Sequence, residues 1–278
     1  MQNEITFTFH PLPFFISLHP NSSHCFMITC SIIGSGKVAS WFVNVIRKHG
    51  GVIRQVYSPT LGHAERLAIT CQAEAIDDLS QLLPQSDLYL FAVRDDAYSS
   101  LLKQLPFTLP MAVHTAGSLS MHLLKSYAES YGVIYPYQTI SQESDFERLT
   151  VPLCVEACDD ITTAQLLQWA AKWSPTSTVV SETQRAYLHL AAVFASNFTN
   201  AMYGIAYDIL TSRQIPFEVI TPLLEQTLEK VKILSPAEAR TGPAARGDRQ
   251  TMEKHLAMLE NEELKAIYRL ISEKIGRK

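Results

Sequence analysis

The feature that most constrains this chain is a glycine turn between an apolar run and an amphipathic stretch. Residues 26–33 are apolar and β-branched, and from Lys37 onward apolar side chains recur at helical spacing. Between them stands the pattern G-x-G-x-x-A, formed by Gly34, Gly36 and Ala39. A strand, a tight glycine turn and a helix in this order are typical of a dinucleotide site.

Each position of the motif has a physical role in such a Rossmann-type site. Gly34 permits the turn, Gly36 lets the backbone approach a pyrophosphate, and Ala39 lets the helix pack tightly on the strand. The helix N-terminus offers free N–H groups and the positive end of its dipole to phosphates. The predicted pyrophosphate contacts are Gly34, Ser35, Gly36, Lys37, Val38 and Ala39.

The end of the second predicted strand, 52–58, bears on the choice of cofactor. An NAD-binding Rossmann domain usually has Asp or Glu about 20 residues beyond the glycines, where it bonds the ribose 2′-hydroxyl. This chain has Ser58, Pro59 and Thr60 there, with no carboxylate to repel a 2′-phosphate. We therefore expect NADP(H) to be favoured over NAD(H), with Arg66 two turns further along as a second phosphate contact.

Apolar segments alternate with helical patterns up to about residue 180, which predicts a parallel sheet flanked by helices. Because ligands bind outside the carboxyl ends of such strands, the residues at and just beyond the ends of the strands 87–93 and 111–114 should face the nicotinamide. These candidates are Ala92, Val93, His114, Thr115, Ala116 and Gly117. His114 either contacts the nicotinamide or only closes the sheet edge. The acidic pair Asp95 and Asp96 is expected to cap the next helix.

From residue 181 the pattern becomes helical, beginning with a long apolar helix over 183–210. His189 and Asn197 lie in this helix and need partners, which are either structural or a substrate. The loop GPAARGD follows at 242–248, where Asp248 is placed to cap a helix. Arg246 either clamps an anion or pairs with Asp248 or a carbonyl. The catalytic candidates are His114, His189, Asn197 and Arg246.

Composition and charge exclude several classes of function. The net charge is −4 and the pI about 6.1, so the chain lacks the basic footprint of a nucleic-acid-binding protein. No apolar run approaches the length of a membrane span. The five cysteines form no C-x-x-C pair, which predicts free thiols, no metal site and a cytoplasmic location. Charged residues are only 18%, and one explanation is a large apolar dimer interface.

Residues 1–26 do not follow the alternation of strands and helices. Their short apolar segment has no basic stretch before it and no small-residue cleavage site after it, unlike a signal peptide. We expect 1–26 to be a disordered extension, 27–180 an NAD(P)-binding Rossmann domain, and 181–278 a helical substrate or dimerisation domain. The predicted fold class is thus an α/β Rossmann-type parallel sheet domain followed by an all-α C-terminal domain.

Five motifs together resemble a known family. They are GSGKVA at 34–39, VYS at 56–58, HTAGS at 114–118, YLHLAAVFASNF at 187–198 and GPAARGD at 242–248. The family consists of Rossmann-like proteins labelled NADP oxidoreductase, coenzyme deazaflavin-dependent type, with a C-terminal helical domain of unknown function. It is similar to pyrroline-carboxylate reductase, ketopantoate reductase and β-hydroxyacid dehydrogenases. The resemblance implies NADP binding and a helical domain that forms a homodimer, but no particular substrate.

Two departures from these relatives matter. Family members often have arginine directly after the serine at the second strand end, where this chain has Pro59, and this weakens the expectation of NADP(H). The β-hydroxyacid dehydrogenases carry a catalytic lysine four residues before an asparagine on their first long helix. Here Asn197 is preceded at that spacing by Val193, so their mechanism does not transfer.

We therefore expect an NAD(P)-dependent oxidoreductase that transfers hydride to a small carbonyl or imine substrate. His114 and His189 are the candidate proton donors, and Arg246 would orient an anionic substrate. The alternative is a protein that binds NADP(H) as a sensor without turnover, which the missing lysine favours. Deazaflavin–NADP hydride exchange rests on the family label alone. The expected partners are a small molecule and a second copy of the chain, with no nucleic acid and no membrane.

Overall fold

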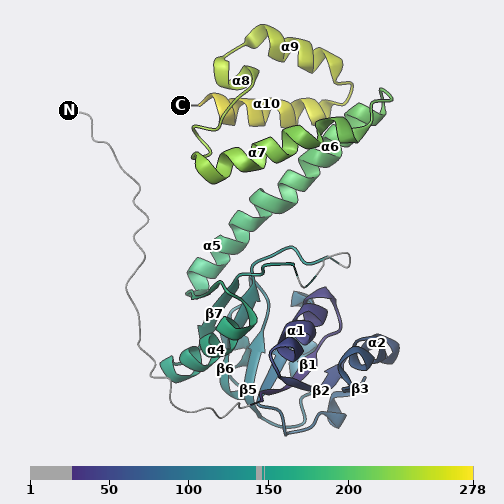
Figure 1. Cartoon of the computed structure of the whole chain (residues 1–278), viewed down its shortest axis with the longest axis vertical. Helices are drawn as coiled ribbons and strands as arrows, with labels where there is room; N and C mark the ends of the chain where they lie inside the picture. The colour runs from purple at the N-terminus through teal and green to yellow at the C-terminus, as the bar shows by residue number, and fades with distance from the viewer. Residues whose placement is uncertain (1–26, 142–145, 147, 278) are drawn as a thin grey trace, which may run out of the picture. The chain divides into compact units, whose positions relative to one another are not determined.

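The computed structural model of the 278-residue chain describes residues 27–141, 146 and 148–277 (Figure 1). The chain divides into two compact units, Met1–Asn197 and Phe198–Lys278. The division falls inside the long helical stretch with which the predicted C-terminal domain begins. The expected extension over residues 1–26, including Cys25, lies outside the described residues.

A single sheet of eight strands organises the described part of the first unit, in the order β3-β2-β1-β4-β5-β6-β7-β8. Neighbouring strands are parallel except β6 and β7, which are antiparallel. The order 3-2-1-4-5-6 is that of a Rossmann fold, whose strand order reverses between β1 and β4. The strands are β1 Thr29–Ile33, β2 Val52–Tyr57, β3 Glu74–Ile76, β4 Leu88–Phe91, β5 Leu109–His114, β6 Ala128–Pro136, β7 Leu153–Ala157 and β8 Ser177–Val179.

Helices cover both faces of this sheet, and Figure 1 labels α1, α2 and α4, which pack on one of the two faces. Side chains of successive strand residues enter opposite cores, so Ile32 lies in one apolar cluster and Ile33 in the other. On the first face, Phe42 and Trp173 join α1 to α4 with ring centroids 6.1 Å apart. The helices on that face are α1 Lys37–Lys48, α2 Leu61–Cys71 and α4 Asp160–Trp173. The opposite face carries η1 Leu79–Gln81, α3 Tyr98–Leu102 and η3 Met121–Leu124, with η2 Asp95–Ala97 leading into α3.

The predicted fold class and the order of strands and helices in the sheet are confirmed, with differences in detail. Strand β3 was not predicted, because three residues are too few to show a period. The expected capping role of Asp95 and Asp96 is wrong. Asp95 instead accepts a hydrogen bond from the Ser118 hydroxyl at 2.5 Å, and Asp96 pairs with Arg94 at 2.8 Å.

The long helix expected over 183–210 is interrupted by a π-helical segment. The whole stretch consists of α5 Glu182–Ala192, the π-helical segment η4 Val193–Phe198 and α6 Thr199–Thr211. A π turn changes the phase of the residues that follow it. The angle between His189 and Asn197 around the helix axis therefore cannot be calculated from the 100° per residue of a regular α-helix. The hydrophobic periodicity of the sequence did not predict the interruption.

The second unit is helical throughout its regular structure. Asp248 caps α9 by accepting from the Thr251 amide at 3.1 Å, as the sequence predicted. His255 lies on α9 and bonds the hydroxyl of Tyr268 on α10 through Nδ1 at 2.9 Å. Besides α6, the unit contains η5 Phe217–Ile220, α7 Thr221–Ile233, α8 Pro243–Arg246, α9 Arg249–Met258 and α10 Glu262–Gly276.

Three further observations bear on the predictions from composition. Cys30, Cys71, Cys154 and Cys158 are all free thiols, and burial raises the pKa of the first three. Among the described helices, none is long and apolar enough to cross a membrane. Within the same residues, no group of three or more His, Cys, Asp or Glu side chains is placed to hold a metal ion.

Candidate active site

The turn between β1 and α1 requires glycine at its first position for two reasons. Gly34 has φ +120°, a conformation that side-chain-bearing residues rarely adopt. A Cβ there would also lie 2.2 Å from the carbonyl oxygen of Ala92, at the end of β4. The Gly34 amide donates to the carbonyl of Tyr57 at 2.9 Å. This glycine thus brings the ends of β1, β2 and β4 into contact.

The N-terminus of α1 is open. Gly36 is the N-cap residue, no side chain caps the helix, and a Cβ on Gly36 would meet nothing within 4 Å. Ala39 is fully buried in the core beneath the helix. The geometry meets the requirement that each motif position would have in a pyrophosphate site: a tight turn, open backbone amides and close helix–strand packing.

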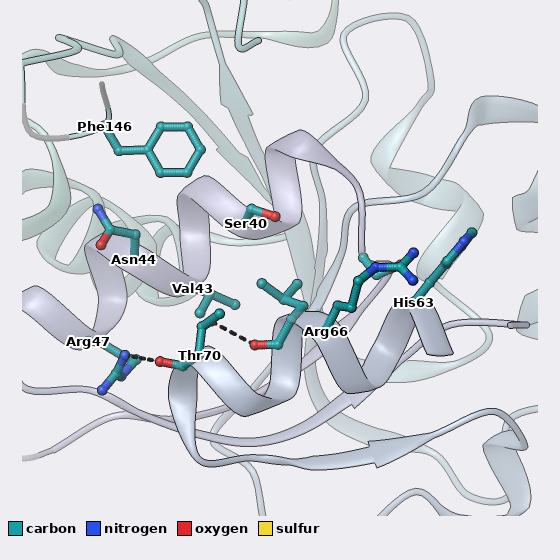
Figure 2. A pocket seen from close by; sticks show the side chains of 10 residues that line it. Ser40, Val43, Asn44, Arg47, His63, Arg66, Thr70 and Phe146 are labelled. Carbon is teal, nitrogen blue, oxygen red and sulfur yellow. Dashed lines mark hydrogen bonds between the residues drawn. The ribbon is translucent and has the colours of Figure 1, made fainter. Parts of the chain in front are cut away.

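A groove of about 650 Å³ lies between α1 and α2 and reaches the glycine turn at Ser35 (Figure 2). His63 and Arg66 lie side by side at one end of the view, and Arg47 lies at the other. Arg47 donates to the carbonyl of Thr70. The lining residues are Ser35, Ser40, Val43, Asn44, Arg47, His63, Arg66, Leu67, Thr70 and Phe146.

The predicted cofactor residues at the end of β2 differ in exposure. Ser58 is buried, and its amide donates to Ile76 at 3.1 Å. Pro59 and Thr60 are exposed, and no side chain caps the N-terminus of α2 at Thr60. The groups near this edge that are able to bind an anion are therefore the open α2 N-terminus and the cationic side chains of the groove.

His114 ends β5 inside the protein rather than on its surface. Its exposed fraction is 0%, and its Nδ1 accepts from the Ala116 amide at 3.2 Å. Nε2 is buried without a partner among the described residues. Burial, with the nearby charge of Arg185, lowers the pKa of His114 to about 3, so the imidazole is neutral. This geometry supports the alternative in which His114 closes the sheet edge.

Arg185 is a structural residue that the sequence analysis missed. It is 1% exposed and donates to Glu156 on β7 through Nη2 at 3.0 Å. Its Nη1 donates to the carbonyls of Ala116 at 3.1 Å and Gly117 at 2.9 Å. The available signal was Glu156 inside the otherwise apolar strand β7, since a charged residue is rarely buried unless it is paired.

Tyr135 and His189 form a hydrogen-bonded pair against the loop after β5. The Tyr135 hydroxyl lies 3.1 Å from His189 Nδ1, and the ring centroids are 6.0 Å apart. A Cβ on Gly117 would lie 2.7 Å from that nitrogen and 2.9 Å from Cζ of Tyr135. Burial raises the pKa of Tyr135 to about 12. His189 was a predicted candidate, whereas Tyr135 was identified only as part of a strand.

The remaining cofactor candidates lie along the same strand ends. Thr115 donates to the Phe91 carbonyl through its amide and its hydroxyl, at 3.1 and 3.3 Å. Ala92 and Val93 follow β4 directly and lie next to Gly34. Ala116 is buried, and its carbonyl accepts a hydrogen bond from Arg185. The loops after β4 and β5 are thus held against the glycine turn, while contact with a nicotinamide stays a prediction.

The other two catalytic candidates are exposed. Asn197 lies in the π-helical segment at the end of the first unit. Arg246 ends α8 in the second unit, and its charge contributes, after the hydrogen bonds from Thr251, to lowering the pKa of Asp248. Their predicted roles stay predictions.

Comparison with known proteins gives the wider context. Residues 151–275 match the family described as domain of unknown function DUF2520. No match was found among curated proteins. Two more distant solved structures share the fold. 1-Pyrroline-5-carboxylate reductase of Streptococcus pyogenes has a TM-score of 0.63 at 15% identity, covering 90% of this chain and 98% of that one. A reductive aminase of Aspergillus terreus in complex with NADPH and ethyl-5-oxohexanoate has a TM-score of 0.64 at 15% identity, covering 90% of this chain and 95% of that one.

A third structure is much more similar in sequence. It is "putative NADP oxidoreductase BF3122" from Bacteroides fragilis, with 35% identity and a TM-score of 0.85. The match covers 91% of this chain and 99% of that chain. The resemblance that the five motifs indicated is therefore confirmed. The chain belongs to the same family as this Bacteroides protein, and its DUF2520 match spans the last two strands of the sheet as well as the helical part.

Proposed function

We propose that this chain is an NADP(H)-dependent reductase that transfers hydride to a small carbonyl or imine substrate. The observation that carries the proposal is the open N-terminus of α1 at Gly36, beside the reversal of strand order between β1 and β4. Dinucleotides bind Rossmann folds at this reversal, with the pyrophosphate on the first helix. Membership of an NADP oxidoreductase family supports the general class of reaction.

The cofactor would lie along the carboxyl ends of the strands. Its pyrophosphate would meet the amides of residues 34–39, and its nicotinamide would reach the ends of β4 and β5 at Val93 and Thr115–Gly117. The A. terreus aminase, which has the same fold, is in complex with NADPH. These placements follow from the strand order and stay proposals for this chain.

The preference for NADP(H) is proposed to come from the α2 side of the groove. His63 and Arg66 lie side by side there, and the groove reaches Ser35 of the glycine turn (Figure 2). A guanidinium binds a phosphate through paired N–H donors. Arg66 would therefore supply the phosphate-binding guanidinium that is missing at Pro59. Arg47 is already bonded to Thr70 and is not part of the proposed phosphate site.

The proposed reduction requires one hydride and one proton. Bound NADPH would supply the hydride to the carbon of C=O or C=N; the bond's electron pair would then lie on the heteroatom, where a proton completes the alcohol or amine. His189 is the proposed donor, because it lies against Gly117 at the end of the β5 loop. The A. terreus aminase with a keto ester bound favours this substrate class.

A sensor that binds NADP(H) without turnover is the second candidate. Two observations favour it: Val193 occupies the position of the dehydrogenase lysine, and His114 is neutral and buried. A reductase needs a donor in contact with solvent or substrate, which leaves His189 as the candidate from the first unit.

We also propose that the protein is a cytoplasmic homodimer joined through its C-terminal helices. Several large apolar side chains of the described helices are exposed, and a hollow of about 410 Å³ lined by Tyr187 and Leu188 lies on α5. Patches of this kind mark protein interfaces. The exposed side chains include Tyr187, Leu190, Phe194, Met202, Tyr207, Val219, Leu223 and Leu270. Sedimentation equilibrium would test the proposal, and a monomer at micromolar concentration would contradict it.

The proposed reaction is tested in two steps. Fluorescence titration of the full chain with NADPH and NADH is expected to give tighter binding of NADPH. A panel of ketones, keto acids and cyclic imines is then screened for NADPH oxidation. Turnover on any of them supports the reductase. Binding without turnover on the whole panel supports the sensor, and no binding of either nucleotide contradicts both.

A further inference from the structure

A row of polar side chains ties α5 and η4 to the strand ends. Glu182, Arg185 and His189 follow one another at spacings of three and four, which keeps them on one side of α5. Ser196 follows in the π-helical segment η4, to which this spacing rule does not extend. Their partners lie in the loop after β5, in β6 and in the segment after β6. The contacts are Glu182 with Ser120 at 2.7 Å, Arg185 with the Gly117 carbonyl at 2.9 Å, His189 with Tyr135 at 3.1 Å and Ser196 with Thr139 at 3.0 Å.

His189 sits within this row directly over the backbone of the β5 loop. A Cβ on Gly117 would overlap its Nδ1 at 2.7 Å, so the absence of a side chain there lets the pair and the loop meet. Arg185, one turn earlier, holds the same loop by donating to the carbonyls of Ala116 and Gly117. The position of His189 relative to the strand ends is therefore fixed from both sides.

The Tyr135 hydroxyl suits a histidine that changes its protonation state. A hydroxyl both donates and accepts, so it donates to Nδ1 of the neutral ring and accepts from Nδ1–H of the imidazolium. Burial raises the pKa of Tyr135 to about 12, which keeps the phenol protonated in both cases. Within the part of the chain that the structure describes, His189 Nε2 has no hydrogen-bond partner.

We propose that Tyr135 is a positioning residue that holds His189 so that Nε2 delivers the proton to the substrate heteroatom. This inference rests on the proposed reductase function. As the hydride reaches the carbon, the electron pair moves to oxygen or nitrogen and takes the Nε2 proton of the imidazolium. Nδ1–H stays bonded to the Tyr135 oxygen, and a proton from water restores the imidazolium.

Other charged and titratable groups lie around the pair. Tyr137 on the β6 side and Cys154 on β7 act on Tyr135, as does the Arg185 guanidinium from α5. Tyr137 contacts the Tyr135 ring with centroids 6.1 Å apart, but its hydroxyl is not bonded to His189. Tyr137→Phe is therefore a matched control that removes a hydroxyl two residues away.

The test compares the full-length wild type with Tyr135→Phe, His189→Gln and Tyr137→Phe, using NADPH and the best compound of the ketone and imine panel. We expect kcat to fall by about tenfold or more in Tyr135→Phe and about a hundredfold in His189→Gln. KM and the Kd for NADPH should change less than about twofold. The pH profile of kcat should shift in Tyr135→Phe and stay in place in Tyr137→Phe.

Nitrogen NMR of the histidine rings adds a readout that needs no substrate. Loss of the Nδ1 hydrogen-bond signature of His189 in Tyr135→Phe, and its retention in Tyr137→Phe, supports the positioning role. Wild-type kcat and pH profile in Tyr135→Phe, or equal losses in Tyr137→Phe, overturn it while leaving the reductase proposal intact. A wild type that binds NADPH and turns over nothing overturns the reductase proposal itself, and the proton-delivery role with it.

Discussion

The candidate active site has two ends, which are built by different means. At the glycine turn, consecutive residues of one segment, 34–39, present backbone amides at an open helix end. At the other end, side chains from distant segments meet: Tyr135 and His189 are 54 positions apart, and Arg185 and Gly117 are 68 apart. One end is a local backbone structure and the other exists only through tertiary packing, so the two should respond differently to substitution.

The largest effect is expected at the packed end, from Arg185→Met. It would leave Glu156 buried without its partner and the Ala116 and Gly117 carbonyls without a donor. Breaking a buried pair in this way costs about 3–5 kcal/mol of unfolding free energy, measured by urea denaturation. Arg94→Met is the control, because Arg94 and Asp96 form a pair with side chains 86% and 67% exposed, and should cost under about 1 kcal/mol. Similar losses in both variants would contradict the importance of the buried pair.

The second prediction compares alanine substitutions at the two glycines of the turn, Gly34 and Gly36. Gly34→Ala combines φ +120° with a Cβ 2.2 Å from a carbonyl oxygen, and should lower the unfolding free energy by about 3 kcal/mol. Gly36→Ala meets no atom within 4 Å and should change stability by less than about 0.5 kcal/mol. It should nonetheless weaken NADPH binding about tenfold, because a side chain at this position of the motif would hinder the close approach of a pyrophosphate to the backbone. Urea denaturation and fluorescence titration measure the two effects, and unchanged NADPH affinity in Gly36→Ala would argue against a pyrophosphate at this position.

A third prediction concerns acid sensitivity at His114. Its pKa is about 3 in the folded protein against 6.5 for an ordinary histidine, so the unfolded chain binds the extra proton between these values. The stabilisation is complete above pH 6.5 and is lost progressively as the pH falls toward 3. From pH 6.5 to pH 5 the loss amounts to about 2 kcal/mol.

His114→Asn removes this titration while keeping an acceptor for the Ala116 amide. The variant should therefore lose about 2 kcal/mol less unfolding free energy than the wild type between pH 6.5 and pH 5. Parallel pH dependence of the two proteins in urea denaturation would show that His114 is not held neutral.

The smallest effect is expected from Arg66→Gln, on the discrimination between cofactors. Loss of one guanidinium from the proposed 2′-phosphate site should weaken NADPH binding about tenfold, or about 1.4 kcal/mol, and leave NADH unchanged. Arg47→Gln lies at the opposite end of the same groove (Figure 2) and should change NADPH affinity less than about twofold. Equal losses for NADPH and NADH in Arg66→Gln would place the 2′-phosphate elsewhere.

Sequence reasoning reached most of the sheet but only part of the candidate site. Gly34, Gly36 and Ala39 were identified because their roles depend on neighbours within a few residues. Arg185 and Tyr135 were missed because their partners, Glu156 and His189, come from elements far along the chain. The π-helical segment was also missed, since a hydrophobic pattern over one helix does not distinguish α from π turns.

The sequence alone determined the Rossmann-type sheet, the glycine turn and the helical character of the C-terminal part. These follow from apolar periodicity and from backbone conformations that only glycine adopts readily, both of which are local properties. Tertiary structure alone decided that His114 is buried and neutral, and that His189 is held by Tyr135 over Gly117. Burial, pKa and hydrogen bonding of a side chain depend on which distant segments pack around it. The glycine turn itself is packed against the carbonyl of Ala92, just after β4.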